Sequence, residues 1–168
     1  MQLKEIDKNR YRKHYKIIFA GIAFVLLIIA PASSALFINL FSNPEGSYLF
    51  HNLAGVVTGV AIITFLLNKF RQHPFMYEVV YVWNLKQQLN RIQRKQRKIE
   101  AAVEDNDKDA MVIMNFMLHG SKQLYELDDN TITMEDLLIK IQVHDKRMEA
   151  AGLSSSTDEF NPTMLERF

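Results

Sequence analysis

Three methionines at helical spacing, followed by a histidine, form the pattern in this chain that comes closest to a metal site. Met111, Met114 and Met117 give the spacing M-x-x-M-x-x-M, and His119 lies two residues further on. Thioether and imidazole groups are ligands of soft copper. Methionine at helical spacing is more often a core residue, because its flexible side chain fills irregular gaps. We therefore predict that these methionines pack in a core and that the chain holds no metal.

An acidic stretch further along has some features of a calcium loop. Asp128, Asn130 and Glu135 supply oxygen ligands, but Ile132 occupies a ligand position and the loop glycine is missing. The sequence also has no glycine-rich phosphate loop, no H-E-x-x-H motif and no G-x-S-x-G motif. The absence of these ligands and motifs argues against a calcium site, a nucleotide-binding site and a hydrolase active site.

Acid–base catalysis would have to rest on two histidines. His119 and His144 are the best candidates, but no pattern in the sequence brings them together. The chain has no cysteine, which excludes thiolate chemistry. We therefore predict that the protein is not an enzyme and that it has no catalytic residue and no cofactor, and the sequence identifies no small-molecule substrate.

Charge is sorted along the chain, and this sorting indicates the elements. Residues 17–44 and 46–68 contain no Lys, Arg, Asp or Glu. Residues 1–16 carry a net charge of +4 and residues 69–98 a net charge of +7, whereas residues 100–168 carry −9. A basic collar beside apolar segments suits a protein that stands on an anionic cytoplasmic leaflet.

The uncharged segments predict two membrane-spanning helices, at 17–41 and 49–68. Each is long enough for the ~30 Å hydrocarbon core at a rise of ~1.5 Å per residue. Pro31 predicts a kink or break in the first helix, because proline removes a backbone donor and clashes with the preceding turn. Residues 42–48, with Pro44 at a position that suits a tight turn, would join the two helices as an antiparallel hairpin.

Lysine and arginine predict the orientation of this hairpin. Residues 1–16 contain six of them and the turn at 42–48 contains none, while Lys69 and Arg71 follow the second span directly. Basic residues flanking spans are retained on the cytoplasmic side. We therefore predict that both termini are cytoplasmic.

A cleaved signal peptide is the alternative interpretation of the first span. A basic start, an apolar run and the small residues Ala30-Pro31-Ala32 also fit a signal peptide. Apolar sequence resumes at Leu36 and continues to Phe41, which favours a spanning helix.

Two glycines on the second span predict close helix packing. Gly55 and Gly59 form a G-x-x-x-G pair, which lets two helices approach closely. The simplest interpretation is that they pack on the first span of the same chain. The alternative is that they join copies of the chain into an oligomer.

Residues 74–151 predict a cytoplasmic antiparallel bundle of about three amphipathic helices, followed by a flexible tail at 152–168. The alternative for the tail is that its apolar residues Phe160, Leu165 and Phe168 dock on the rest of the chain. The first helix carries apolar residues alternately three and four apart, as in a coiled-coil seam with Gln96 as its polar position. The seam consists of Leu85, Leu89, Ile92, Ile99 and Val103. The later helices are expected at about 108–127 and 134–151. The expected fold class is therefore all-α, a transmembrane helical hairpin followed by a bundle.

A basic face lies on the other side of the seam helix. Arg91, Arg94, Lys95 and Lys98 fall within one arc. Such a face can be solvated, can contact anionic lipid, or can contact an acidic partner such as the chain's own acidic third helix. Nucleic acid is a poor fit, because no recognition motif accompanies the charge.

Three segments resemble a family of short two-span bacterial membrane proteins that is classed as a domain of unknown function. They are Arg71–Pro74, Glu78–Lys86 and Leu127–Thr133. The resemblance extends over nearly the whole chain. It implies a bacterial inner membrane and assigns no activity or site residue.

These features predict a non-enzymatic, membrane-anchored scaffold or accessory subunit that presents its helical bundle to a protein partner or to another copy of itself. The alternative is an oligomeric transport or channel component that associates through Gly55 and Gly59. No ionisable residue lies at mid-depth in either span, which weighs against the alternative.

Overall fold

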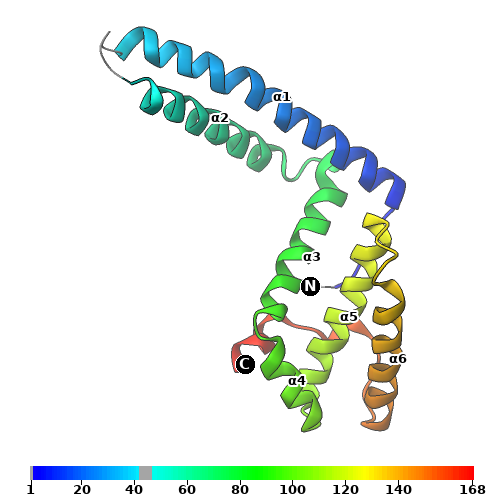
Figure 1. Ribbon diagram of the computed structural model, residues 1–168. Helices are drawn as coiled ribbons and strands as arrows, with labels where there is room; N and C mark the ends of the chain where they lie inside the picture. Colours follow the sequence, from blue (N-terminus) through cyan, green and yellow to red (C-terminus); the bar gives the residue numbers. More distant parts are fainter. Residues whose placement is uncertain (1, 42–46) are drawn as a thin grey trace. The chain divides into compact units, whose positions relative to one another are not determined.

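The computed structural model describes residues 2–41 and 47–168, and within these ranges the regular elements are helices and no strand is present (Figure 1). The predicted all-α fold is confirmed, with two long apolar helices followed by further helices. Contacts divide the chain into two compact units. We call Lys13–Val79 the hairpin unit, and we call the N-terminal residues up to Arg12 together with Val80–Phe168 the bundle unit.

Helices α1 (Lys8–Phe41) and α2 (Leu49–Phe70) lie side by side (Figure 1). Most of the expected turn, residues 42–46 with Pro44 and Gly46, lies outside the described residues. α1 continues through Pro31, so the break that the sequence allowed there is absent. A single proline removes one backbone donor, and neighbouring turns can keep their own hydrogen bonds.

Four α-helices build most of the bundle unit. They are α3 (Tyr77–Gln93), α4 (Gln96–Glu104), α5 (Lys108–Asp128) and α6 (Met134–Ala150). α5 is the central element, because it contacts α4, α6 and the chain that follows α6. Its Met111, Ile113 and Phe116 have no exposed surface, so the core of the unit lies along this helix.

The ends of α5 follow local chemistry. Asp107 caps its start, because the carboxylate accepts a hydrogen bond of 2.9 Å from the backbone N–H of Ala110. Asp129 ends it in the left-handed conformation at φ 56°, and its backbone N–H donates to the main-chain oxygen of Tyr125. Gly152 at φ 69° follows the end of α6 in the same conformation, as expected for a helix stop.

The seam helix is divided, whereas its periodicity predicts one continuous element. α3 ends at Gln93 and α4 begins at Gln96, with Lys95 at φ −109° and ψ 5° between them. The Lys95 ammonium donates a 2.6 Å hydrogen bond to the main-chain oxygen of Leu165. Periodicity could not signal this division, because it accompanies a contact with residues far along the chain.

The segment after α6 is packed, whereas the sequence predicts a flexible tail at 152–168. It forms two short 3₁₀-helices, η2 (Thr157–Glu159) and η3 (Pro162–Arg167). Phe160 is 3 % exposed and stacks on Phe116 with ring centroids 4.1 Å apart. The Asn115 amide donates to the main-chain oxygen of Ser155 at 2.9 Å. Burial of a few apolar residues fixes a segment whose average composition is polar.

Candidate functional site

A groove with a volume of about 550 Å³ opens on the bundle unit. In Figure 1 α5 lies between α4 and α6, and its residues form the floor of the groove. The residues that the three helices contribute to the lining include Gln96, Glu100, Val103, Met114, Met117, Leu118, Leu137, Ile139, Val143, His144 and Arg147.

The groove combines apolar walls with a charged rim. Ile139 and Val143 of α6 are 55 % and 61 % exposed, and both line the groove. At the rim, Arg147 donates to the Glu104 carboxylate at 2.8 Å, which lowers the pKa of that carboxyl. Large apolar side chains on a groove wall, with charges at the edge, are the usual features of a surface that accepts an amphipathic helix.

The methionines of the M-x-x-M-x-x-M pattern belong to the core and the groove floor. Met111 is fully buried, Met114 is 8 % exposed, and Met117 is partly buried. Among the described residues, no group of three or more His, Asp or Glu side chains could hold a metal ion.

The structure brings the two candidate catalytic histidines near each other, but not in a catalytic arrangement. Buried His144 donates from Nε2 to the main-chain oxygen of Met111 at 2.9 Å. Burial lowers the pKa of His144, and this effect outweighs the hydrogen bond to Met111 and the charge of Asp145, which raise it. His119 Nε2 lies 3.6 Å from the Asp145 carboxylate, which is too long for a hydrogen bond. His144 therefore acts as a neutral core residue whose donor is satisfied by the backbone.

The predicted basic face is shared between solvent and the C-terminal segment. Arg91 and Arg94 are exposed. Lys95 and Lys98 instead donate to the main-chain oxygens of Leu165 and Phe168, at 2.6 and 2.7 Å. Two of the four basic residues of this face, Lys95 and Lys98, therefore bind the C-terminal segment through its main-chain oxygens.

The predicted packing residues are buried in both units. Of α2, Gly55 and Gly59 are the buried residues, and they face α1. In the bundle unit the seam residues Leu85, Leu89, Ile92, Ile99 and Val103 are between 0 % and 8 % exposed.

An N-terminal contact that the sequence does not predict completes the bundle unit. The Tyr81 hydroxyl accepts from the Lys4 backbone N–H and donates to the Gln123 side chain, both at 2.8 Å. The Gln123 amide in turn donates to the Lys4 carbonyl at 2.5 Å. Tyr11 is 3 % exposed and lies 3.4 Å from the Asp128 carboxylate. The bundle unit therefore includes the N-terminal segment, which the expected domain at 74–151 leaves out.

Ion pairs at the end of α5 accompany this contact. Lys8 and Arg12 both pair with the Asp129 carboxylate, and these contacts lower its pKa. Lys86 pairs with Asp128 at 2.9 Å. The signal in the sequence is the opposite charge of residues 1–12 and of the Asp128-Asp129 pair, but charge alone does not indicate which acidic pair is the partner.

Comparison with known proteins rests on one family. A family model described as "Protein of unknown function (DUF3087)" matches residues 1–165. The chain belongs to this family. No curated protein and no solved structure matches it.

In this DUF3087 member, the three segments that resemble the family, Arg71–Pro74, Glu78–Lys86 and Leu127–Thr133, each make hydrogen bonds or ion pairs in the fold. His73 caps a 3₁₀-helix (η1, Pro74–Met76), because its Nδ1 accepts from the Phe75 backbone N–H at 3.2 Å. Glu78 lies 3.2 Å from His14 in the hairpin unit. The Leu127–Thr133 segment supplies the two aspartates that pair with Lys8, Arg12 and Lys86. These strings thus have structural roles in the fold of this chain.

Proposed function

We propose that this chain is a non-enzymatic, membrane-anchored scaffold or accessory subunit whose bundle unit binds an amphipathic helix of a partner protein. The observation that carries the proposal is the groove on α5, with Ile139 and Val143 exposed on its wall. Exposed apolar residues beside a charged rim are costly in water unless a partner covers them. A helix with its apolar face on α5 and its polar edge toward Glu100 and Lys140 would cover them.

The composition and exposure of α1 and α2 support a membrane anchor. Each contains an 18-residue window apolar enough to cross a bilayer, and 6 % and 11 % of these windows are buried. A core helix of a water-soluble protein would be mostly buried. Leu27 and Phe50 are 76 % and 77 % exposed, so the apolar surface faces outward. Hydrocarbon is the surrounding that such a surface favours.

Charge supports an inner-membrane location with both termini in the cytoplasm, as the sequence predicts. α1 has 34 residues, about 51 Å at ~1.5 Å per residue, which exceeds the ~30 Å core. Its basic first turns would therefore stand outside the hydrocarbon. The contacts of Lys4, Lys8 and Arg12 with the bundle unit favour a retained N-terminus over a cleaved signal peptide.

Exposed Arg91 and Arg94 suit anionic lipid or an acidic partner, while Lys95 and Lys98 already contact main-chain oxygens. A transport or channel oligomer built through Gly55 and Gly59 has less support, because both glycines face α1 of the same chain.

A photo-crosslinking amino acid at single positions of α6 tests the proposal. We expect position 143, on the groove wall, to crosslink one stoichiometric protein in native membranes. Position 146, an exposed lysine of α6 outside the groove lining, is the matched control and should give no such product. Ile139→Asp should remove the product at position 143, because it places a charge on the apolar wall. Equal crosslinking at both positions, or a product unaffected by Ile139→Asp, would contradict a partner in the groove.

A further inference from the structure

One face of α3 carries the single tryptophan of the chain together with two arginines. Trp83 is 62 % exposed, and Gln87, Asn90 and Arg94 follow it at spacings of four, three and four residues. These spacings place the four side chains along one stripe of the helix, with Arg91 at its edge. The backbone N–H of Arg94 donates to the main-chain oxygen of Asn90 at 3.2 Å, so the stripe continues through the residue that follows α3. All five residues are exposed, and we call them the α3 face.

The charge of the α3 face is positive and has no counter-charge nearby in sequence. Residues 79–99 contain no Asp or Glu. Among the described residues, the side chains of Arg91 and Arg94 form no ion pair, whereas Lys86, on the neighbouring side of the same helix, pairs with Asp128 at 2.9 Å. Two exposed guanidinium groups on the stripe of Trp83 are therefore available to an anionic ligand.

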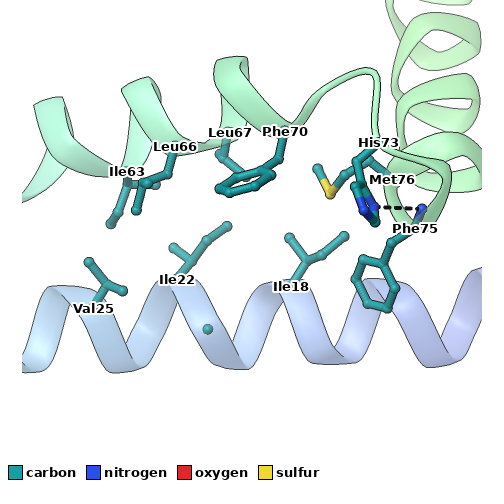
Figure 2. Close-up of a pocket in the computed structure, with 11 residues that line it drawn as sticks. Ile18, Ile22, Val25, Ile63, Leu66, Leu67, Phe70, His73, Phe75 and Met76 are labelled. Carbon is teal, nitrogen blue, oxygen red and sulfur yellow. Dashed lines mark hydrogen bonds between the residues drawn. The ribbon is translucent and has the colours of Figure 1, made fainter.

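The connection between α2 and α3 is short and packed. It consists of residues 71–76, which can span at most ~25 Å even when fully extended. Met76 is 8 % exposed, and the ring of Phe75 lies 4.0 Å from the ring of His14 of α1, measured between centroids. Figure 2 shows Phe75 and Met76 beside Ile18 of α1, around an apolar hollow of about 400 Å³ within the hairpin unit. The first turn of α3 is therefore held close to the end of α2.

We infer that the α3 face binds the anionic surface of the membrane, with the Trp83 indole at the level of the headgroups and the guanidinium groups of Arg91 and Arg94 on lipid phosphates. The inference rests on the proposed membrane insertion of α1 and α2. Anionic headgroups complement the positive α3 face, and each basic group near such a surface favours binding. Tryptophan prefers the membrane interface, because its ring is apolar and its N–H needs a polar partner. Arginine binds phosphate through two parallel N–H donors.

The α3 face is separate from the groove on α5. None of its five residues lines the groove. A bundle unit that binds lipid through the α3 face can therefore keep the groove open to a partner helix. Contact with lipid would restrict the orientation in which the scaffold presents this groove.

The single tryptophan makes fluorescence of the full chain a direct test. The chain is reconstituted in vesicles of phosphatidylcholine alone and of phosphatidylcholine with phosphatidylglycerol, and bromine-labelled phosphatidylcholine is the quencher in both. We expect Trp83 emission to be quenched in the phosphatidylglycerol vesicles at low salt and recovered at high salt, because salt screens exposed charges. Arg91→Gln combined with Arg94→Gln should lower the ratio of quenched to unquenched emission about thirtyfold, the change expected when two basic groups leave an anionic surface.

A matched variant removes the same charge elsewhere in the bundle unit. Lys108→Gln combined with Lys146→Gln changes exposed positions of α5 and α6 and should leave the quenching unchanged. An equal loss in this control would overturn the inference, because net charge and not the α3 face would then be responsible. Equal quenching in the two kinds of vesicle would overturn it too, as would unchanged quenching in the arginine variant. Absence of quenching in both kinds of vesicle would overturn it in favour of an acidic protein partner.

Retention of the chain by the vesicles after an alkaline wash is measured in parallel. A retained chain with unquenched Trp83 overturns this inference alone. A chain that the wash removes overturns the proposed membrane anchor, and the inference with it.

Discussion

The hairpin unit and the bundle unit distribute apolar residues in opposite ways. In α2 the buried residues are glycines, and large side chains such as Phe50 and Phe65 face outward. In α5 most of the buried residues are large, Phe116 among them, and charged residues such as Lys108 and Glu126 are exposed. Burial of apolar area stabilises a fold in water, whereas close approach of backbones stabilises helix pairs in lipid. This contrast is what the proposed membrane insertion of the hairpin unit predicts.

The largest expected effect lies in the core of the bundle unit. Phe116→Ala removes a fully buried ring that stacks on Phe160, and we expect it to lower the free energy of unfolding by about 3–5 kcal/mol. Thermal unfolding of the full chain in mild detergent measures the change. Phe24→Ala, at a position that is 65 % exposed on α1, is the matched control and should cost far less. Similar losses for both variants would break the contrast between the units.

A smaller effect is expected at the closest point of the hairpin. Gly55→Val would place a side-chain carbon against the backbone of Ala30 and Ser34, so we expect a loss of about 1–3 kcal/mol. Gly21→Ala is the control, because nothing lies within 4 Å of the added carbon. Unfolding in detergent and the proximity of α1 and α2 by engineered crosslinks are the measurements. A stable, close-packed hairpin in the Gly55→Val variant would contradict the packing described.

The next effect depends on pH and belongs to the bundle unit. Burial lowers the pKa of His144 below its ordinary 6.5, so the unfolded chain takes up a proton first as the pH falls. The stability from neutral His144 is present above pH 6.5 and is lost as the pH falls below that value toward the folded pKa. Melting temperatures on both sides of pH 6.5 should fall more steeply with acid in the unaltered chain than in His144→Gln. Parallel curves would show that His144 does not contribute.

The smallest effect concerns the ion pairs between the N-terminal segment and the end of α5. Asp129→Asn removes the charge that Lys8 and Arg12 share, and asparagine tolerates the left-handed backbone at this position. These groups are exposed, so we expect a slight loss of stability that disappears at high salt. Proteolysis of the N-terminal segment, compared at low and high salt, is the sensitive measurement. Unaltered protection at low salt would show that Tyr11 and Lys4 hold the segment without the ion pairs.

Periodicity and charge predicted the parts of the fold that rest on regular patterns. The seam from Leu85 to Val103 is buried, and the helices near 108–127 and 134–151 appear close to those bounds. The division at Arg94–Lys95 was not predictable, because it accompanies a contact between residues far apart in sequence. For the segment with Phe160 the sequence offers apolar residues that can dock, but it does not indicate that Phe116 is the partner. The groove was hidden for another reason. At helical spacing Ile139 and Val143 lie away from the buried residues Leu137, Ile141 and Met148 of α6, so the pattern that indicates a core gives no sign that they line a groove.

The most direct test of the central claim uses the absence of cysteine from the chain. Single cysteines replace Gln2, Ser47 or Ser154, and a membrane-impermeant maleimide is applied to intact cells and to permeabilised cells. A membrane-anchored scaffold with both termini in the cytoplasm predicts labelling at position 47 in intact cells, with positions 2 and 154 labelled after permeabilisation alone. Labelling of position 2 or 154 in intact cells would contradict it, as would protection of position 47 until the membrane is opened.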